Sequence, residues 1–174
     1  MSKKIQPPIA KIIPKKLEKF GDVRIDNYYW LNDRENPEVI DYLNKENAYY
    51  KKMTAHTKAF QKELFEEMKS RIKEDDESVP YLYNGYYYIT RFEKGKNYPI
   101  YSRKKESLSA KEEILFDCNK LAKGQSYFQL GGLSISPDNK LAVFSTDVVG
   151  RRIYDIQIKN LETGKILSDK IEKV

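Results

Sequence analysis

Apolar residues recur at helical spacing between residues 36 and 72, and this pattern predicts two amphipathic helices. The first is expected to run from an N-cap at Asn36 to about Lys52, because a proline and then an acid follow the cap. Thr57 is the expected cap of the second helix. The apolar positions are Val39, Tyr42, Leu43, Tyr50 and Met53 in the first helix and Phe60, Leu64, Met68 and Ile72 in the second. We expect these faces to meet in an αα-hairpin with an apolar seam.

From residue 81 onward, short runs of β-branched and aromatic residues separated by turn signals are typical of antiparallel strands. Strands are expected at residues 86–90, 99–102, 113–116, 132–136, 140–146, 153–160 and 165–167, with a polar loop at 120–125. Four short strands in about 40 residues is the period of a β-propeller blade. Residues 81–116 and 130–167 are therefore predicted to form two blades, whereas a closed ring needs roughly four to eight.

The segments before and between these elements have their own composition. Residues 1–21 are expected to form an extended arm, because the prolines at positions 7, 8 and 14 disfavour a helix. Trp30 is expected to anchor the apolar segment 22–33 against a core. The acidic run 74–77 and the residues that follow it end the helical periodicity. We predict an α+β fold in which residues 1–76 are the arm and αα-hairpin and residues 77–174 are antiparallel β-meanders.

The positive charge is concentrated at one end of the chain. Residues 1–19 hold six lysines and one glutamate, so almost all of the net charge of +6 lies there and the rest of the 174 residues are nearly neutral. Such a tail is typical of a solvated or docking arm and not of a nucleic-acid groove. No stretch approaches the roughly 20 apolar residues that cross a bilayer, so no membrane partner is expected. The single cysteine, Cys118, excludes an intramolecular disulfide and fits a cytoplasmic location.

Few residues have the sequence context that catalysis requires. His56 is the only histidine, which excludes a multi-histidine metal site, and a solvated or capping role is expected between the two helices. Ser134 lacks the final glycine and the strand-to-helix turn of a nucleophile elbow, so it is interpreted as a strand residue. Asp117 precedes Cys118 and would raise the pKa of the thiol, which favours an inert, buried cysteine.

Binding motifs are equally sparse. Gly131-Gly132 belongs to no phosphate-binding motif, and the acidic run 74–77 lacks the spacing of a calcium loop. The tyrosines between residues 81 and 101, with Arg91 and Arg103, are residue types that stack single-stranded bases, but their alternating placement favours strand formation. We therefore predict no catalytic, cofactor-binding or metal-binding residue in this chain, no cofactor and no nucleic-acid partner.

Five segments distributed along the chain carry a family resemblance. They are Gly21-Asp22-Val23-Arg24-Ile25-Asp26-Asn27-Tyr28-Tyr29-Trp30-Leu31, then Asp41-Tyr42-Leu43 with Glu46-Asn47, then Lys94-Gly95-Lys96-Asn97-Tyr98-Pro99-Ile100-Tyr101, then Leu130-Gly131 to Ser136-Pro137-Asp138, and Lys159-Asn160-Leu161-Glu162-Thr163-Gly164. In this order they resemble the prolyl oligopeptidase family, and within it the oligopeptidase B branch.

The resemblance implies a serine peptidase in which a seven-bladed propeller covers an α/β-hydrolase domain and admits only short peptides. In the oligopeptidase B branch, cleavage follows basic residues. The resemblance also implies that residues 1–76 pack on the hydrolase domain and that residues 77–174 are the first blades. The family's catalytic serine, aspartate and histidine come from later segments, so this chain alone is expected to be inactive without a C-terminal hydrolase domain and further blades.

Two other readings follow from the same pattern. An apolar helix face and an unpaired sheet edge would allow the isolated chain to self-associate. The alternative from another functional class is a non-catalytic partial-propeller module that serves as a binding scaffold or as a nucleic-acid adaptor. The adaptor would bind nucleic acid with a steep dependence on salt.

Overall fold

The chain divides into two compact units, Met1–Arg71 and Ile72–Val174, in a computed structural model that describes residues 5–174. The boundary predicted between residues 76 and 77 separates a part that packs on a hydrolase domain from the propeller blades, and this division of roles stays a prediction. In the first unit, residues 5–14 form no helix or strand, as expected for an arm.

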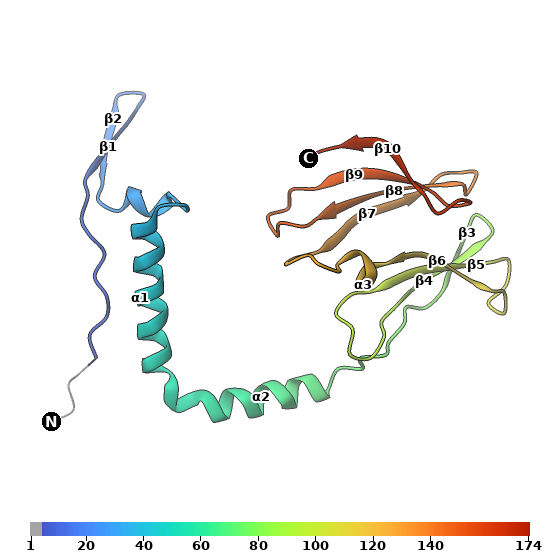
Figure 1. The fold of residues 1–174 in the computed structure, drawn as a ribbon, viewed down its shortest axis with the longest axis horizontal. Coiled ribbons are helices and arrows are strands. Elements are labelled where there is room, and N and C mark those ends of the chain that lie inside the picture. The colour runs from blue at the N-terminus through green and yellow to red at the C-terminus, as the bar shows by residue number, and fades with distance from the viewer. Residues whose placement is uncertain (1–4) are drawn as a thin grey trace. The chain divides into compact units, whose positions relative to one another are not determined.

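A β-hairpin follows the arm and was not predicted (Figure 1). Strands β1 (Lys15–Lys19) and β2 (Asp22–Asp26) pair antiparallel, and the two residues between them have positive φ, 52° at Phe20 and 79° at Gly21. Two left-handed residues in succession are the geometry of the tight hairpin turn that matches strand twist. The extended arm predicted over residues 1–21 is therefore too long, because its last residues belong to this hairpin.

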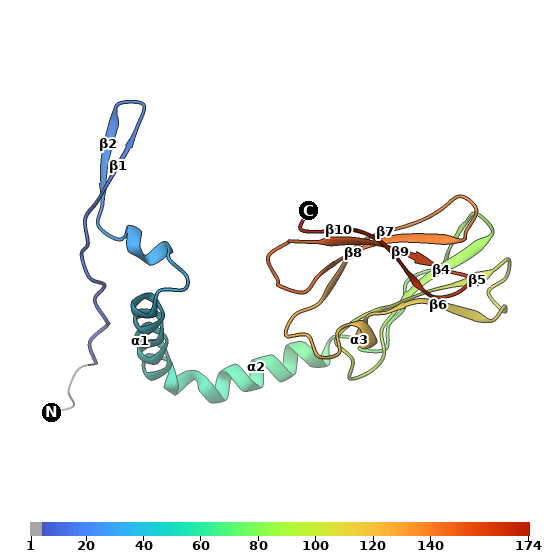
Figure 2. The same cartoon turned by 45° about the horizontal axis from the view of Figure 1, so that its top comes forward.

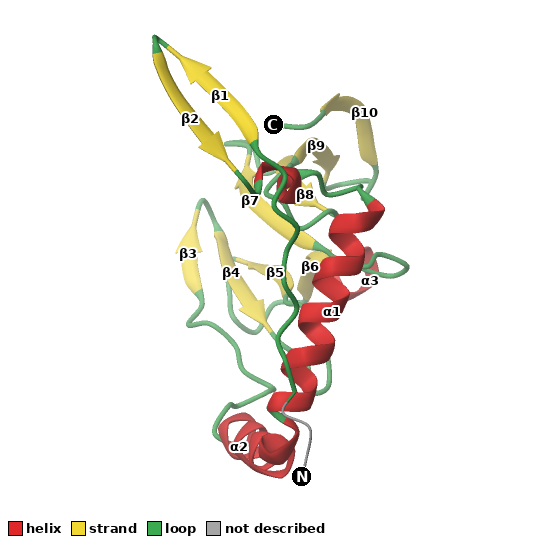
Figure 3. Cartoon of the chain, turned by 90° about the vertical axis from the view of Figure 1, so that its left-hand side faces the viewer, coloured by secondary structure: helices red, strands yellow, loops and turns green. Residues whose placement is uncertain are grey.

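Trp30 is half-buried between the arm and the first long helix, and it does not belong to the buried core against which it was expected to anchor residues 22–33. It lies in the short 3₁₀ helix η1 (Tyr29–Asn32), and its indole Nε1 donates a hydrogen bond to the carbonyl oxygen of Lys11 at 3.0 Å. Its ring meets that of Tyr42 edge to face at 6.3 Å. Lys11 also forms an exposed ion pair with Glu38 at 3.0 Å, so the arm lies along this helix (Figure 3).

Helix α1 (Pro37–Met53) begins as the sequence predicts. The Asn36 side-chain oxygen accepts a hydrogen bond from the backbone N–H of Glu38 at 2.9 Å. Helix α2 (Lys58–Ser70) also begins after Thr57, as predicted, but the Thr57 side chain makes no capping hydrogen bond. The Thr57 hydroxyl donates backward to the carbonyl oxygen of Thr54 at 2.8 Å, because residues 55–57 form the 3₁₀ turn η2 (Ala55–Thr57).

The predicted apolar seam between α1 and α2 is also wrong. Figures 1 and 3 show that α2 leads away from the end of α1 and does not fold back along it. The seam residues Leu43, Tyr50, Met53, Phe60, Leu64 and Met68 are exposed, and Ile72 lies beyond the end of α2. Helical periodicity identifies an apolar face but not the surface that covers it. No helix within residues 5–174 has the length and apolar run needed to cross a membrane.

The second unit contains two four-stranded antiparallel sheets, each a meander in chain order. The first sheet consists of β3 (Tyr81–Tyr83), β4 (Tyr86–Arg91), β5 (Ile100–Lys105) and β6 (Glu112–Asp117). The second sheet consists of β7 (Gln129–Ile135), β8 (Leu141–Asp147), β9 (Asp155–Asn160) and β10 (Ile166–Ile171). These ranges confirm the two predicted blades. The polar loop is shortened by the unpredicted helical turn α3 (Cys118–Leu121), which the Asp117 side chain caps.

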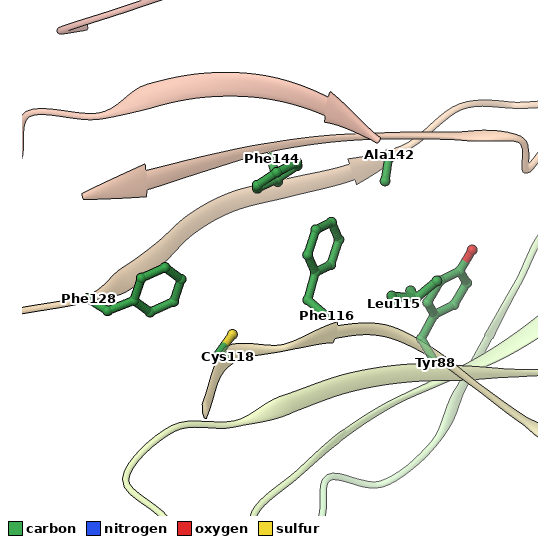
Figure 4. Packing of buried hydrophobic residues seen from close by; sticks show 7 residues of the cluster. All are labelled: Tyr88, Leu115, Phe116, Cys118, Phe128, Ala142 and Phe144. Atoms are coloured by element: carbon green, nitrogen blue, oxygen red, sulfur yellow. The ribbon is translucent and has the colours of Figure 1, made fainter. Parts of the chain in front are cut away.

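The core of this unit lies between the two sheets, which are stacked face to face (Figures 1 and 2). Figure 4 shows side chains from both sheets pointing toward one another. Phe116 and Phe144 lie 4.6 Å apart between ring centroids, and Tyr98 meets Phe128 edge to face at 5.8 Å. The buried cluster consists of Tyr88, Leu115, Phe116, Cys118, Phe128, Ala142 and Phe144. Aromatic packing of this kind binds one blade to the next.

Candidate functional site

The turns at one end of the two sheets are joined by reciprocal hydrogen bonds. The Asn84 side-chain Nδ2 donates to the carbonyl oxygen of Pro137 at 2.7 Å, and the Asn139 Nδ2 donates to the carbonyl oxygen of Asn84 at 3.1 Å. Both asparagines have left-handed φ values, 47° and 61°. Asparagine tolerates this conformation, and its short amide can reach a neighbouring backbone from it. We call Asn84, Pro137 and Asn139 the turn clamp.

Arg103 extends the turn clamp into the interior. Its side chain is only 4% exposed and forms a two-pronged ion pair with Glu113, with Nε and Nη2 at 2.8 and 3.0 Å from the carboxylate oxygens. Nη2 also donates to the carbonyl oxygen of Asn139 at 3.2 Å. Burial alone would lower the pKa of Arg103, but the hydrogen bonds with Glu113 and Tyr88 and the charge of Glu113 together outweigh burial, so the pKa is raised and the guanidinium stays charged.

A cavity of about 460 Å³ lies between strands β3, β4 and β5 of the first sheet and strand β7 of the second. It is lined by Tyr81, Tyr83, Tyr88, Thr90 and Tyr101 of the first sheet and by residues 133–135 of β7. The Tyr81 and Tyr88 rings stack at 5.4 Å between centroids. This volume falls within the range of small-molecule sites, and aromatic walls suit a side chain or a ring.

A second polar feature is the loop after β8, which is built around the buried carboxylate of Asp147. Its oxygens accept backbone hydrogen bonds from Val149, Gly150 and Arg152 at 2.8, 2.9 and 2.8 Å. Burial alone would raise the pKa of Asp147, but these hydrogen bonds outweigh burial and the pKa is lowered. The ionised carboxylate therefore stabilises the conformation of the loop by accepting hydrogen bonds from its backbone.

Acidification is expected to destabilise this loop. Since the folded pKa of Asp147 lies below the unfolded value of about 3.9, its contribution to stability is present above that pH and is lost as the pH falls through the folded value. Asp147→Asn should lower the melting temperature near neutral pH by about 5 °C or more and should flatten the acid branch of its pH profile. Thermal melts between about pH 2 and 7 measure both. Asp169→Asn, an exposed carboxylate on β10, is the control and should leave the profile unchanged.

Cys118 is buried, as predicted, and is 1% exposed. Burial, followed by the charge of Asp117, raises the pKa of the thiol to about 11. We expect a disulfide reagent at about pH 8 to modify the folded chain at least about 100-fold more slowly than the urea-unfolded chain. Reaction at the same rate in both states would contradict a buried, protonated thiol.

The remaining candidates from the sequence are dispersed. His56 is exposed, and its Nδ1 lies 3.1 Å from the carbonyl oxygen of Met53, while Ser134 lies in β7 as predicted. The acidic run is not a free linker, because the carbonyl oxygen of Asp76 accepts from the backbone N–H of Phe92 at 2.8 Å. No group of three or more His, Cys, Asp or Glu side chains suited to a metal ion occurs within residues 5–174. The predicted absence of catalytic, cofactor and metal residues stays a prediction.

The arginines considered for base stacking are held by carboxylates. Arg91 pairs with Glu112 at 2.9 Å and with Glu93 at 2.8 Å, while Arg103 pairs with Glu113. No sequence pattern predicts the turn clamp or the loop around Asp147. Both depend on backbone groups that only the folded chain brings within reach, although Asp and Asn beside turns are residue types that make such bonds.

Two consecutive four-stranded meanders that share one aromatic core are part of a β-propeller. Residues 7–174 match the family model described as prolyl oligopeptidase, N-terminal beta-propeller domain. The chain belongs to the prolyl oligopeptidase family.

Several relatives and solved structures match almost the whole of this chain. The chain is 40% identical over 168 residues to dipeptidyl aminopeptidase BI from Pseudoxanthomonas mexicana, a match that covers 87% of this chain and 23% of that protein. It is 37% identical to protease 2 from Moraxella lacunata, covering 96% of this chain and 25% of that protein. Oligopeptidase B from Leishmania major is similar in structure, with a TM-score of 0.84, 33% identity and coverage of 96% of this chain and 26% of that one. The chain thus spans about a quarter of the length of the relatives that it matches.

Proposed function

We propose that this chain is the N-terminal part of an oligopeptidase B-like serine endopeptidase that hydrolyses short peptides after basic residues. The observation that carries the proposal is the match of residues 7–174 to the family's N-terminal propeller model, together with the 0.84 TM-score to oligopeptidase B. In this proposal the chain contributes structure and access control, and later segments contribute the catalytic serine, aspartate and histidine.

Residues 1–76 would pack on the hydrolase domain. The exposed apolar side chains of α1 and α2 support this role, since large apolar faces on a helix require a covering surface. In the absence of that domain, the same faces and the outer edge of β10 would favour self-association. Residues 77–174 would be the first blades of the propeller that restricts entry to short peptides, in a cytoplasmic enzyme.

A nucleic-acid adaptor is the less favoured alternative. Base stacking would need arginines free to contact phosphate or bases, whereas Arg91 and Arg103 already form ion pairs with glutamates. We therefore expect a titration with single-stranded DNA to show no binding at low or at high salt. Binding that weakens steeply as salt is added would favour the adaptor instead.

The isolated chain is the first test of the proposed role. Purified residues 1–174 should release no product from a blocked arginyl peptide amide, because hydrolysis needs the later segments. Hydrolysis that coelutes with the chain and is abolished by a serine-hydrolase inhibitor would contradict the proposal. The circular dichroism spectrum should show β-structure in the same sample, so that inactivity is measured on folded protein.

A further inference from the structure

The cavity between β3, β4, β5 and β7 has an aromatic wall that follows from the strand register. Tyr81 lies opposite Tyr88 in the β3–β4 pair. Thr90 lies opposite Tyr101 in the β4–β5 pair. Opposed residues, and residues two apart in a strand, lie on the same face of a sheet, so these four side chains and that of Tyr83 form one continuous surface. Figure 4 shows Tyr88 on this face, pointing toward the second sheet.

The floor of the cavity is fixed by the core, whereas its rim is open. Tyr88 belongs to the buried cluster, and Leu133 and Ile135 of β7 pack against that cluster from the other side. Tyr81 and Tyr83, by contrast, are exposed. A ligand can therefore enter past the rim without displacing the core, as in binding sites that are largely formed before the ligand arrives.

The lining selects an uncharged aromatic group. None of the eight described residues that line the cavity carries a charge, so a charged ligand would lose its hydration without gaining a partner. The rings of Tyr81 and Tyr88 are stacked, with 21° between their planes, and the Tyr83 ring is tilted by 52° to that of Tyr88. A further ring can extend this array by stacked or edge-to-face contacts, which an aliphatic group cannot make.

The strands beside the cavity favour a peptide as the molecule that carries this ring. Within residues 5–174, β3 pairs only with β4 and β7 pairs only with β8, so both are edge strands. An edge strand exposes a row of backbone N–H and C=O groups that an extended peptide can pair with, while alternate side chains of the peptide enter neighbouring pockets. With seven residues against three, β7 offers the longer edge.

We propose that this cavity binds an extended peptide with an uncharged aromatic side chain, whose ring lies against Tyr81 and Tyr88 and whose backbone pairs with the edge of β7. The choice of a peptide rests on the proposed function, whereas the preference for an aromatic ring rests on the cavity. No lining residue attracts a basic side chain. The cavity would therefore bind a residue of the peptide other than the basic one after which cleavage is proposed.

A titration followed by nuclear magnetic resonance measures this binding without any hydrolysis. The probes are blocked pentapeptides that differ only in the central residue, which is phenylalanine, leucine or lysine. The phenylalanine peptide should bind residues 1–174 about 3–10-fold more tightly than the leucine peptide, because only the ring makes aromatic contacts. The lysine peptide should bind at least about tenfold more weakly than the phenylalanine peptide, since its charge has no partner in the cavity.

Two matched substitutions on β3 place the binding site. Tyr81→Leu removes the ring but keeps an apolar side chain at the rim, and it should abolish the preference for phenylalanine over leucine. Leu82→Ala is the control, because Leu82 is 60% exposed, as Tyr81 is 62% exposed, and the side chains of successive strand residues point to opposite faces. This variant should keep the preference of the unsubstituted chain.

A modified peptide tests the backbone pairing. The phenylalanine peptide with every residue N-methylated keeps its ring but cannot donate backbone hydrogen bonds, so it should bind at least about fivefold more weakly. In the unmodified complex, the backbone amide signals of β7 should shift.

Three results would overturn the proposal: equal affinity for the phenylalanine and leucine peptides, an unchanged preference in Tyr81→Leu, or tighter binding of methyl α-glucoside, a sugar that also stacks on tyrosine, than of the phenylalanine peptide. Undiminished binding of the N-methylated peptide would overturn the pairing with β7. These measurements involve no catalysis, so their failure is distinguishable from failure of the proposed peptidase role, which only an assay of product release detects.

Discussion

Glu113→Ala is expected to destabilise the second unit by about 3 kcal/mol, because it removes the partner of a buried guanidinium. Arg103 is 4% exposed and cannot shed its proton, so the substitution leaves a buried charge beside the carbonyl oxygen of Asn139, the Tyr88 side chain and the face of the Tyr86 ring, with no carboxylate to balance it. The ring lies 4.1 Å from the guanidinium carbon. Urea unfolding followed by near-ultraviolet circular dichroism measures the loss.

The neighbouring residue provides a matched control for this substitution. Glu112 and Glu113 are exposed to a similar extent, at 30% and 39%, but Arg91, the partner of Glu112, is 25% exposed whereas Arg103 is 4% exposed. Water can solvate Arg91 when its partner is removed, so Glu112→Ala should cost about 1 kcal/mol or less. If the two substitutions lowered the free energy of unfolding equally, burial of Arg103 would not explain the contribution of its ion pair to stability.

Gly131→Ala is expected to cost about 1–3 kcal/mol by overpacking. A methyl group at this position would contact the Ser145 hydroxyl and lie 2.9 Å from the Tyr154 ring. The Ser145 side chain can rotate away from the methyl group, but the bulky Tyr154 ring cannot yield as easily. We therefore expect β7 to shift relative to β8. The same urea titration measures the effect.

Gly132→Ala is the control, since a methyl group there meets nothing within 4 Å. The two glycines are adjacent in the irregular part of β7, where its pairing register with β8 shifts between Leu130 and Leu133, so they are matched in backbone setting and differ in what a methyl group would meet. Gly132→Ala should therefore leave stability unchanged within about 0.5 kcal/mol. A comparable loss at Gly132 would indicate that a backbone conformation unsuited to alanine, and not the contact with Tyr154, explains the effect.

The β-region could be predicted from sequence because its signals are local. Alternating side chains mark the strands, and Pro137-Asp138-Asn139 marks a turn that the structure places between β7 and β8. The α1 start followed from Asn36 for the same reason. The hairpin of β1 and β2 was not predicted because most of its side chains are charged and exposed. A strand without a buried face shows no alternation of apolar and polar residues in the sequence.

The junction between the blades could not be predicted, because it depends on groups far apart in the chain. Arg103 lies 36 residues from Asn139, and Asn84 lies 53 residues from Pro137. No periodicity or turn signal reports which backbone carbonyl a side chain will reach. The seam assigned to α1 and α2 failed for a related reason, since an amphipathic pattern shows that a helix face needs a partner without naming it.

A chimeric enzyme tests the central claim most directly. The N-terminal quarter of Leishmania major oligopeptidase B that this chain matches would be replaced by residues 1–174, leaving the remainder of that enzyme unchanged. We predict that the chimera folds and hydrolyses a blocked arginyl peptide amide with a kcat/KM within about 100-fold of the parent enzyme. A chimera that folds cooperatively but has no measurable hydrolysis would contradict the claim that this chain is the propeller portion of such a peptidase.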